Sequence, residues 1–166
     1  MKNSDWQSYC EYALDPKVMR YICPIESIDI IREHFDGYAQ DWDAKEGHWM
    51  GLSVVLQQSK KMIGDVGFRY KSKEHQQIEI GYKFNRKYHG QGYGSEAVDA
   101  LVSYIYEHWD FHKLVAYCDP RNIASFKLME RYGMKREGHF KEHFNFGDGW
   151  QDELAYGVLK RDIKLP

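Results

Sequence analysis

Apolar residues recur along the chain with two periods, and these predict its elements. From Ser27 to Gly47 they repeat at helical spacing, so we predict one amphipathic helix ending at Gly47. Two shorter helical pieces are predicted before it, over Asp5–Leu14 and Pro16–Ile22. Short apolar and β-branched runs predict strands, and the remaining elements are strands over 48–58, 62–71 and Ile78–Phe84, a helix over Ser95–Trp109, a strand over Leu114–Cys118, a helix over Ile123–Arg131 and strands over 134–146 and 150–163.

The order of these elements predicts an α+β fold. The runs 48–58 and 62–71 suit an antiparallel hairpin, and so do the last two runs, which flank an Asp-Gly turn. The strand, helix and strand in the middle of the chain require a parallel crossover. We therefore expect a single domain over residues 1–166, built on a mixed, mainly antiparallel sheet flanked by helices, with a central β-α-β crossover.

Composition removes several classes of function. A net charge of −2 gives no basic field of the kind that binds nucleic acid. The chain has no apolar run long enough for a membrane span, and its N-terminus lacks the apolar core of a secretory signal. Three cysteines without C-x-x-C spacing suit a reducing compartment and predict neither a disulfide framework nor a metal site. We expect a cytoplasmic protein without membrane, nucleic-acid or metal partners.

A glycine-rich loop between the strand Ile78–Phe84 and the next helix is the strongest chemical signal. In the segment His89–Gly94 three glycines alternate with larger residues, and Ser95 follows at the expected helix start. Glycines let a pyrophosphate approach the backbone, and a helix N-terminus attracts its charge. A P-loop is excluded because no Gly-Lys-Ser/Thr follows. Two alternatives stay open: a glycine turn without a ligand, and a dinucleotide-binding protein in which Asp119 would bind ribose.

The sequence resembles the GNAT superfamily of acetyl-CoA-dependent N-acetyltransferases. His89-x-x-Gly92-x-Gly94 is similar to the family's Q/R-x-x-G-x-G/A loop, with His in place of Gln or Arg. The block NIASFKLMERYGMKREG is similar to the family's N-x-x-S-x-x-L-x-x-x-G-F segment, and the ending GHFKEHFNFGDGWQDELAYGVL resembles the RimJ/RimL branch of ribosomal-protein N-terminal acetyltransferases. The family's usual first strand is not visible in residues 1–9, which are short of apolar residues.

This resemblance implies an enzyme that uses acetyl-CoA as cosubstrate. The amides of residues 90–95 would bind the pyrophosphate, and the exposed backbone from Lys83 to Arg86 would pair with the pantetheine arm. Asn122 matches a cofactor-contacting position, although a helix N-cap explains it equally well. The residues expected at the cofactor are Phe84, Arg86, His89, Gly90, Gln91, Gly92, Tyr93, Gly94, Ser95 and Asn122.

The resemblance also suggests the proton-transfer groups. Many relatives donate a proton to the leaving thiolate from a Tyr, where this chain has Met129, and a thioether has no proton to donate. Ser125, one turn earlier on the same predicted helix, is the first candidate for this role, and Tyr132 is a weaker one. Glu79 matches a general-base glutamate of some relatives. Strand alternation turns it away from the apolar face, so it points either into a polar cleft or to solvent. Glu142 and His143 are further candidates for the base.

The expected acceptor is a primary amine, either of a small molecule or at a peptide N-terminus. An α-amine, with a reference pKa of about 8, is easier to deprotonate than a lysine side chain, which suits a site without an obviously strong base. Acceptor selection is expected in the 27–47 segment and the 147–150 turn, with Trp42, Trp49, Asp148 and Trp150 as candidate residues. A homodimer is possible. The alternative from another class is a non-catalytic acyl-CoA-binding or regulatory module.

Overall fold

A single open sheet runs through the computed structural model, which describes residues 1–147 and 149–165. Within that part the sheet has six strands in the order β1-β2-β3-β4-β6-β5. Every neighbouring pair is antiparallel except β3 and β4, which are parallel. The predicted mixed, mainly antiparallel sheet with one crossover is confirmed. The strands are β1 (Met50–Val55), β2 (Met62–Ser72), β3 (Gln77–Phe84), β4 (Lys113–Cys118), β5 (Lys135–Asn145) and β6 (Trp150–Leu159).

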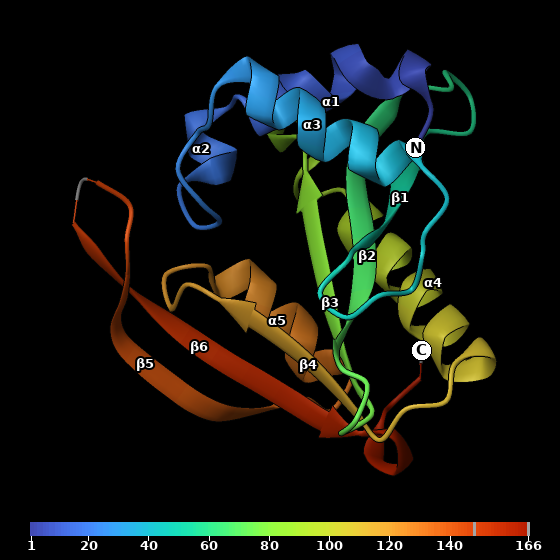
Figure 1. Cartoon of the computed structure of the whole chain (residues 1–166), viewed down its shortest axis with the longest axis vertical. Coiled ribbons are helices and arrows are strands. Elements are labelled where there is room, and N and C mark those ends of the chain that lie inside the picture. Colours follow the sequence, from blue (N-terminus) through green and yellow to red (C-terminus); the bar gives the residue numbers. More distant parts are fainter. Residues whose placement is uncertain (148, 166) are drawn as a thin grey trace.

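Helices cover both faces of the sheet (Figure 1). The crossover helix α4 packs on one face, where Phe68, Ile78 and Leu114 meet Leu101 and Ile105 in the main core. The N-terminal helices form a second core on the other face, around Tyr12, Phe35 and Met62. The helices are α1 (Trp6–Ala13), α2 (Pro16–Met19), α3 (Ile28–Ala39), α4 (Tyr93–His108) and α5 (Ile123–Arg131), with 3-10 turns at Asn3–Asp5, Arg86–Tyr88 and Lys160–Asp162.

The predicted helix from Ser27 to Gly47 is wrong in its second half. The helix α3 ends at Ala39, and Gln40 is extended with φ −83° and ψ 164°. Trp42 still joins the core, but from a loop: its ring lies 5.2 Å from that of Phe68, and its Nε1 donates to the His48 carbonyl at 2.8 Å. The apolar spacing therefore predicted correctly that Trp42 packs against the core, but it predicted wrongly that the backbone there is helical.

Other boundaries shift by a few residues. The helix α2 ends at Met19 instead of Ile22, and α4 begins at Tyr93 instead of Ser95. The earlier start follows from Gly92, whose left-handed φ of 87° forms the N-cap. The two predicted hairpins are present as β1–β2 and β5–β6. Asp148, in the predicted Asp-Gly turn of the second hairpin, lies outside the described residues.

The feature that shapes the site is the divergence of the two parallel strands. Pairing between β3 and β4 runs from Gln77 with Lys113 only as far as Glu79 with Val115. Beyond Glu79, β3 stays with β2, while β4 leaves with β6 and β5, so the sheet opens as a V (Figure 1). Backbone groups of β3 past Glu79 thus have no strand beside them on the β4 side within the described chain. Such groups need another hydrogen-bonding partner.

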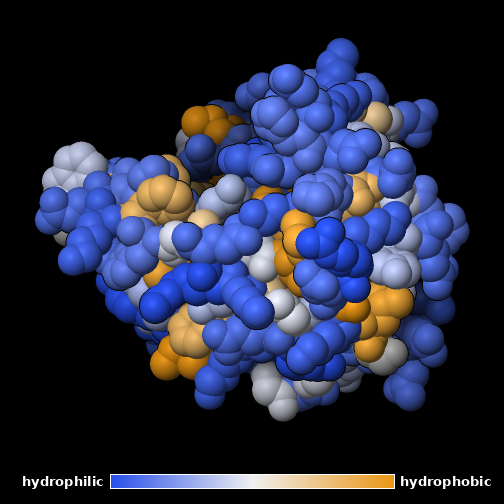
Figure 2. Space-filling view, turned by 90° about the horizontal axis from the view of Figure 1, so that it is seen from below, coloured by the Kyte–Doolittle hydropathy of each residue, from blue (hydrophilic) through white to orange (hydrophobic). Residues whose placement is uncertain are grey.

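Figure 2 shows one face of the molecular surface. Seen from below, it is mainly hydrophilic with scattered apolar patches (Figure 2). In the described part of the chain, no helix has both the length and the apolar character that a membrane span requires.

Candidate active site

A groove with a volume of about 710 Å³ occupies the V between β3 and β4. One wall comes from β3 and the loop that follows it, and the other from β4, α5 and the β5–β6 hairpin. The predicted glycine loop, Ser125 and Glu79 all line this one cavity. The fold therefore brings together residues that the sequence places in three separate segments.

The glycine loop is built around two left-handed residues. Gly90 has φ 72° and Gly92 has φ 87°, conformations that side-chain-bearing residues avoid. Gly92 then caps α4, and the first N–H groups of a helix have no partner within it. Gly90, Gly92, Gly94 and Ser95 line the groove, so these donors and the positive end of the α4 dipole face it. Such an arrangement binds phosphate.

The predicted cofactor residues divide into two groups by the position of their side chains. Phe84, His89 and Asn122 line the groove with the glycines and Ser95. The side chains of three others point elsewhere: Arg86 pairs with Asp15 at 3.4 Å, Gln91 donates to the Lys87 carbonyl at 3.0 Å, and the Tyr93 ring packs on Tyr88. The side chains of these three residues therefore do not face the groove, and any contact with a cofactor would come from their backbone groups.

His89 contacts the end of β3. Its Nε2 lies 2.9 Å from the Phe84 carbonyl oxygen, an acceptor, so Nε2 carries the proton in this contact. The ring therefore ties the loop to the strand that borders the groove. This is a different contact from the phosphate contact expected from its place in the motif.

Lys83 anchors the same strand end to α1. Its ammonium donates to the Tyr9 hydroxyl at 2.9 Å and lies 3.9 Å from Asp65, which accepts from the Tyr12 hydroxyl at 2.6 Å. Burial alone would lower the pKa of Lys83, but the neighbouring Asp65 carboxylate outweighs it and the pKa is raised. The charge stays on Lys83, and the groove wall is held by buried polar contacts.

Ser125 faces the groove with a tyrosine beside it. Its Oγ is 3.1 Å from the Tyr82 hydroxyl, which is also 3.0 Å from the Ser125 carbonyl oxygen. Asn122 caps α5 by accepting from the Ser125 N–H at 3.3 Å, so the predicted N-cap is present. Burial raises the pKa of Tyr82, which keeps its hydroxyl protonated. Two hydroxyl groups therefore lie together in the groove, whose lining also includes the Met129 thioether.

Tyr132, the weaker candidate for the acid, is placed outside the groove. Its hydroxyl donates to Asp99 at 2.5 Å on α4, and its ring is buried in the main core. Burial and this carboxylate raise the pKa of Tyr132.

Cys118, at the end of β4, lines the groove, and burial raises the pKa of its thiol to about 12.

Glu79 is buried at the point where the strands part, with 8% of its surface exposed. The solvent-facing alternative for this residue is therefore wrong. Its Oε2 accepts from Nε and Nη2 of Arg69 at 3.0 and 2.8 Å, and Lys71 lies 3.8 Å away. The Arg69 guanidinium stacks over the Trp49 ring at 4.6 Å. The face of the groove away from α4 thus holds a fixed carboxylate beside an aromatic ring.

Neither Glu142 nor His143 is among the groove-lining residues. Glu142 sits at an irregular position of β5 with φ 49°, and its N–H donates to Asp152 at 2.9 Å. His143 lies between the rings of Phe140 and Phe144, at 5.0 and 4.4 Å.

Comparison with known proteins decides the family. The sequence profile described as "Acetyltransferase (GNAT) domain" matches residues 1–135. The uncharacterized N-acetyltransferase YnaD of Bacillus subtilis (strain 168) is 34% identical over 158 residues, covering 95% of this chain and 89% of YnaD. The chain belongs to the GNAT acetyltransferase family.

Other GNAT proteins support the same assignment. The solved structure of a GNAT-family acetyltransferase from Bacillus anthracis has a TM-score of 0.82 and 31% identity, covering 97% of this chain and 92% of that one. The [Ribosomal protein uS5]-alanine N-acetyltransferase of Escherichia coli (strain K12) is 25% identical over 142 residues, covering 80% of this chain and 73% of the relative. The resemblance to ribosomal-protein acetyltransferases is thus confirmed among its homologues. This GNAT protein is an acetyl-CoA-dependent N-acetyltransferase that transfers an acetyl group to amines.

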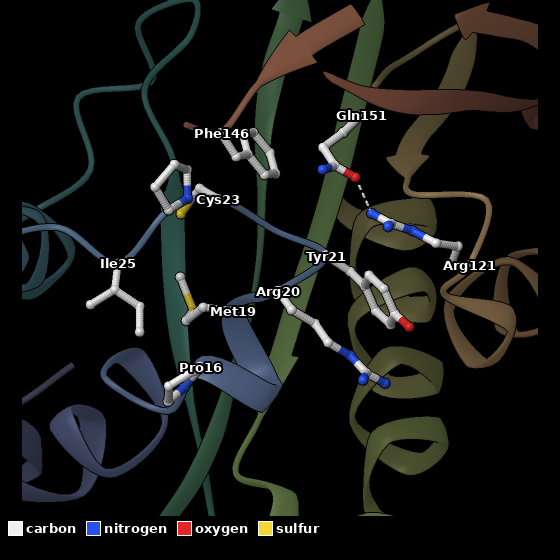
Figure 3. Close-up of a pocket in the computed structure, with 10 residues that line it drawn as sticks. Pro16, Met19, Arg20, Tyr21, Cys23, Ile25, Arg121, Phe146 and Gln151 are labelled. Carbon is white, nitrogen blue, oxygen red and sulfur yellow. Dashed lines mark hydrogen bonds between the residues drawn. The ribbon is translucent and has the colours of Figure 1, made fainter. Parts of the chain in front are cut away.

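A smaller cavity adjoins the groove of this GNAT protein on the side of α2. It has a volume of about 380 Å³ and shares Tyr21, Phe146 and Gln151 with the groove. Figure 3 shows Tyr21 between the guanidinium groups of Arg20 and Arg121, which lie 4.3 and 5.3 Å from the ring centre. Arg121 also pairs with Asp119 at 2.5 Å and bonds to Gln151. The groove therefore continues into a pocket with aromatic and cationic walls.

Sequence reasoning missed several residues of the GNAT groove, above all Tyr82, Tyr117 and Glu153. Strand alternation offered a signal for two of them. Tyr117 and Glu153 fall on the opposite face of β4 and β6 from the core residues Cys118 and Leu154. The partner of Tyr82 on α5 is set by packing, and no local pattern identified it.

Proposed function

We propose that this acetyltransferase acts on a peptide α-amine or a small amine of similar basicity, in the groove between β3 and β4. The observation that carries the proposal is that one cavity joins the glycine loop, the Ser125 and Tyr82 hydroxyls and the carboxylate of Glu79. A phosphate site, a proton donor and a carboxylate are what acetyl transfer from a CoA thioester to an amine requires.

The cosubstrate would be held mainly by backbone groups. The amides from Gly90 to Ser95 suit the pyrophosphate, because they face the groove at the N-terminus of α4. The pantetheine arm would pair with β3 beyond Glu79, where β4 has left the strand. That placement leads the thioester toward Ser125 and Tyr82. Side chains of the loop would add little, since Arg86, Gln91 and Tyr93 are engaged elsewhere.

Ser125 would protonate the leaving thiolate. It is 9% exposed and lines the groove, and its Oγ contacts the Tyr82 hydroxyl at 3.1 Å. Tyr82 can pass a proton to Ser125 because the two hydroxyl groups are in hydrogen-bonding contact. This pair would replace the tyrosine that Met129 displaces in the motif.

The acceptor would enter from the face that carries Glu79 and Trp49. Glu79 can hold an ammonium group through Oε1, which accepts no hydrogen bond from any described residue. The adjoining pocket beside Tyr21 offers room for the rest of a peptide. The relative that acts on the alanine of ribosomal protein uS5 supports a peptide acceptor. An α-amine would also need only a modest base.

The test is a comparison of initial rates on three acceptors: a short peptide with a free α-amine, a lysine side chain with its α-amine blocked, and spermidine. Release of free CoA and the mass of the acetylated product are measured together. We expect the α-amine peptide to be fastest, and the same peptide acetylated at its N-terminus to be inert. A clear preference for spermidine would refute the acceptor proposal. Thermal stabilisation by CoA without turnover on any amine would support the non-catalytic module.

Two further expectations stand as proposals. We place the protein in the cytoplasm because its cysteines form no disulfide pattern. A homodimer stays a prediction, and sedimentation at several protein concentrations would test it.

A further inference from the structure

Glu153 is a mostly covered carboxylate that the proposed function leaves without a role. It lies on β6 and lines the groove, and 20% of its side chain is exposed. No described residue donates a hydrogen bond to it. The nearest basic side chain is His143, whose Nε2 lies 3.7 Å from Oε2, beyond hydrogen-bond range. The carboxylate oxygens can therefore accept a hydrogen bond from a group that enters the groove.

Glu79 differs from Glu153 although both face the same cavity. The two Arg69 donors occupy Oε2 of Glu79 and fix its side chain. No described residue holds Glu153 in this way, so it can change its protonation without breaking an ion pair at hydrogen-bond distance. Of these two carboxylates, Glu79 is therefore the one that the described part of the chain fixes in place.

Titratable groups on β2, β3, β4 and β5 interact electrostatically with Glu153. Burial raises its pKa, the charge of Glu79 adds to that effect, and His143 and Lys71 oppose it. The same two carboxylates act on Tyr117 of β4. Burial raises the pKa of Tyr117, and the charges of Glu79 and Glu153 raise it further. The net result is a glutamate whose pKa is raised, which makes it a better proton acceptor near neutral pH than an ordinary surface glutamate.

We propose that Glu153 is a further catalytic residue that takes the proton from the acceptor's ammonium group, while Glu79, fixed by Arg69, holds that group at the split of the strands. The inference rests on the proposed function and deepens it, because it specifies that the acceptor amine binds in its cationic, ammonium form. It also gives the two groove carboxylates separate roles.

The ammonium group loses one proton to Glu153, and the nitrogen lone pair then forms a bond to the thioester carbon, whose carbonyl electrons move to oxygen. Collapse of this tetrahedral oxyanion breaks the carbon–sulfur bond, and the thiolate takes a proton from Ser125. The nitrogen's second proton restores Ser125 through Tyr82 or solvent. The products are an amide and CoA, and Glu153 releases its proton to solvent.

The test compares E153Q with wild type on the fastest acceptor of the three-amine panel. General-base removal typically costs about 10²-fold or more, so we expect kcat/KM at pH 7 to fall by about that factor. In wild type, kcat/KM should rise with pH through the carboxylate's pKa. In E153Q it should rise only as the amine itself loses its proton, near pH 8 for an α-amine. The loss should therefore shrink at high pH.

Three controls keep the result interpretable. E137Q removes a carboxylate on the neighbouring strand β5 that pairs with Lys113 at 2.6 Å and does not line the groove, so its activity should match wild type. E153D keeps a carboxylate and should retain the wild-type shape of the pH profile at a lower rate. The affinity for CoA, measured by calorimetry, should be unchanged in E153Q, which also shows that the variant is folded.

Three results would overturn the inference, and they can be told apart. If wild type turns over an amine and E153Q stays within about twofold of it at every pH, Glu153 takes no proton and only this inference fails. If wild type binds CoA but acetylates none of the three amines, the proposed function fails and the role of Glu153 fails with it. A drop in E153Q that is equal at all pH values would assign it a structural role instead.

Discussion

Replacing Gly92 by alanine separates backbone strain from ligand contact, because the chain contains a matched glycine elsewhere. Gly92 has φ 87°, and a Cβ built there meets nothing within 4 Å. Gly47, in the loop after α3 and outside the groove, has φ 83° and equally open space. Both G92A and G47A therefore introduce the same left-handed alanine without a steric clash. Only Gly92 lies at the N-terminus of α4, facing the proposed phosphate site.

The expected magnitudes follow from this pairing. A left-handed alanine costs about 1 kcal/mol of folding stability, which lowers Tm by about 2–4 °C in a chain of this size. That loss should be similar in both variants. A Cβ at Gly92 also keeps a phosphate from the backbone donors, and losing one charge-assisted hydrogen bond costs about 1.5–3 kcal/mol. The affinity of G92A for CoA should therefore fall by about 10- to 150-fold.

Calorimetry with CoA and thermal unfolding of the CoA-free proteins measure the two effects separately. We expect equal small Tm losses, with a weaker Kd in G92A alone. Equal CoA affinity in G92A and wild type would refute the reasoning, because the loop would then not contact the cofactor. Equal weakening in G92A and G47A would also refute it, since the effect would come from stability.

Three further predictions follow from the groove. S125A should lower kcat by about 10²-fold with little change in CoA affinity, and Y82F should give a smaller loss; full activity in S125A would remove it as the acid. N122A should cost about 1 kcal/mol through loss of the α5 N-cap, seen as a lower Tm by calorimetric scanning, whereas an unchanged Tm would show that the cap is dispensable. With its pKa raised to about 12, the Cys118 thiol should stay protonated and resist iodoacetamide at pH 8, as followed by mass spectrometry of the folded protein; rapid alkylation there would contradict the placement.

Local sequence rules were enough for the parts of the site built from neighbouring residues. The glycines from Gly90 to Gly94 predicted a loop that opens a helix, and the structure has α4 there with Gly90 and Gly92 in the left-handed conformation. Asn122 was predicted as the cap of α5 for the same reason, and its side chain accepts from the Ser125 N–H. These are contacts between residues only a few positions apart.

Contacts between distant segments escaped prediction. The Tyr82 hydroxyl reaches Ser125 only because β3 and α5 face each other across the groove. Arg69 holds Glu79 from the adjacent strand β2, and the spacing of the two residues along the chain does not predict this ion pair. For Trp42 the helical spacing predicted correctly that the ring packs on the core. It predicted a helix, however, where the structure has a loop. Tertiary packing decided all three.

The central claim is that main-chain donors between β3 and α4 bind the diphosphate of coenzyme A. The most direct measurement is a calorimetric titration of the wild-type chain with CoA, followed by the same titration in the presence of excess NAD⁺. We predict saturable binding of CoA that NAD⁺ does not displace. An absence of CoA binding, or its displacement by NAD⁺, would contradict the account.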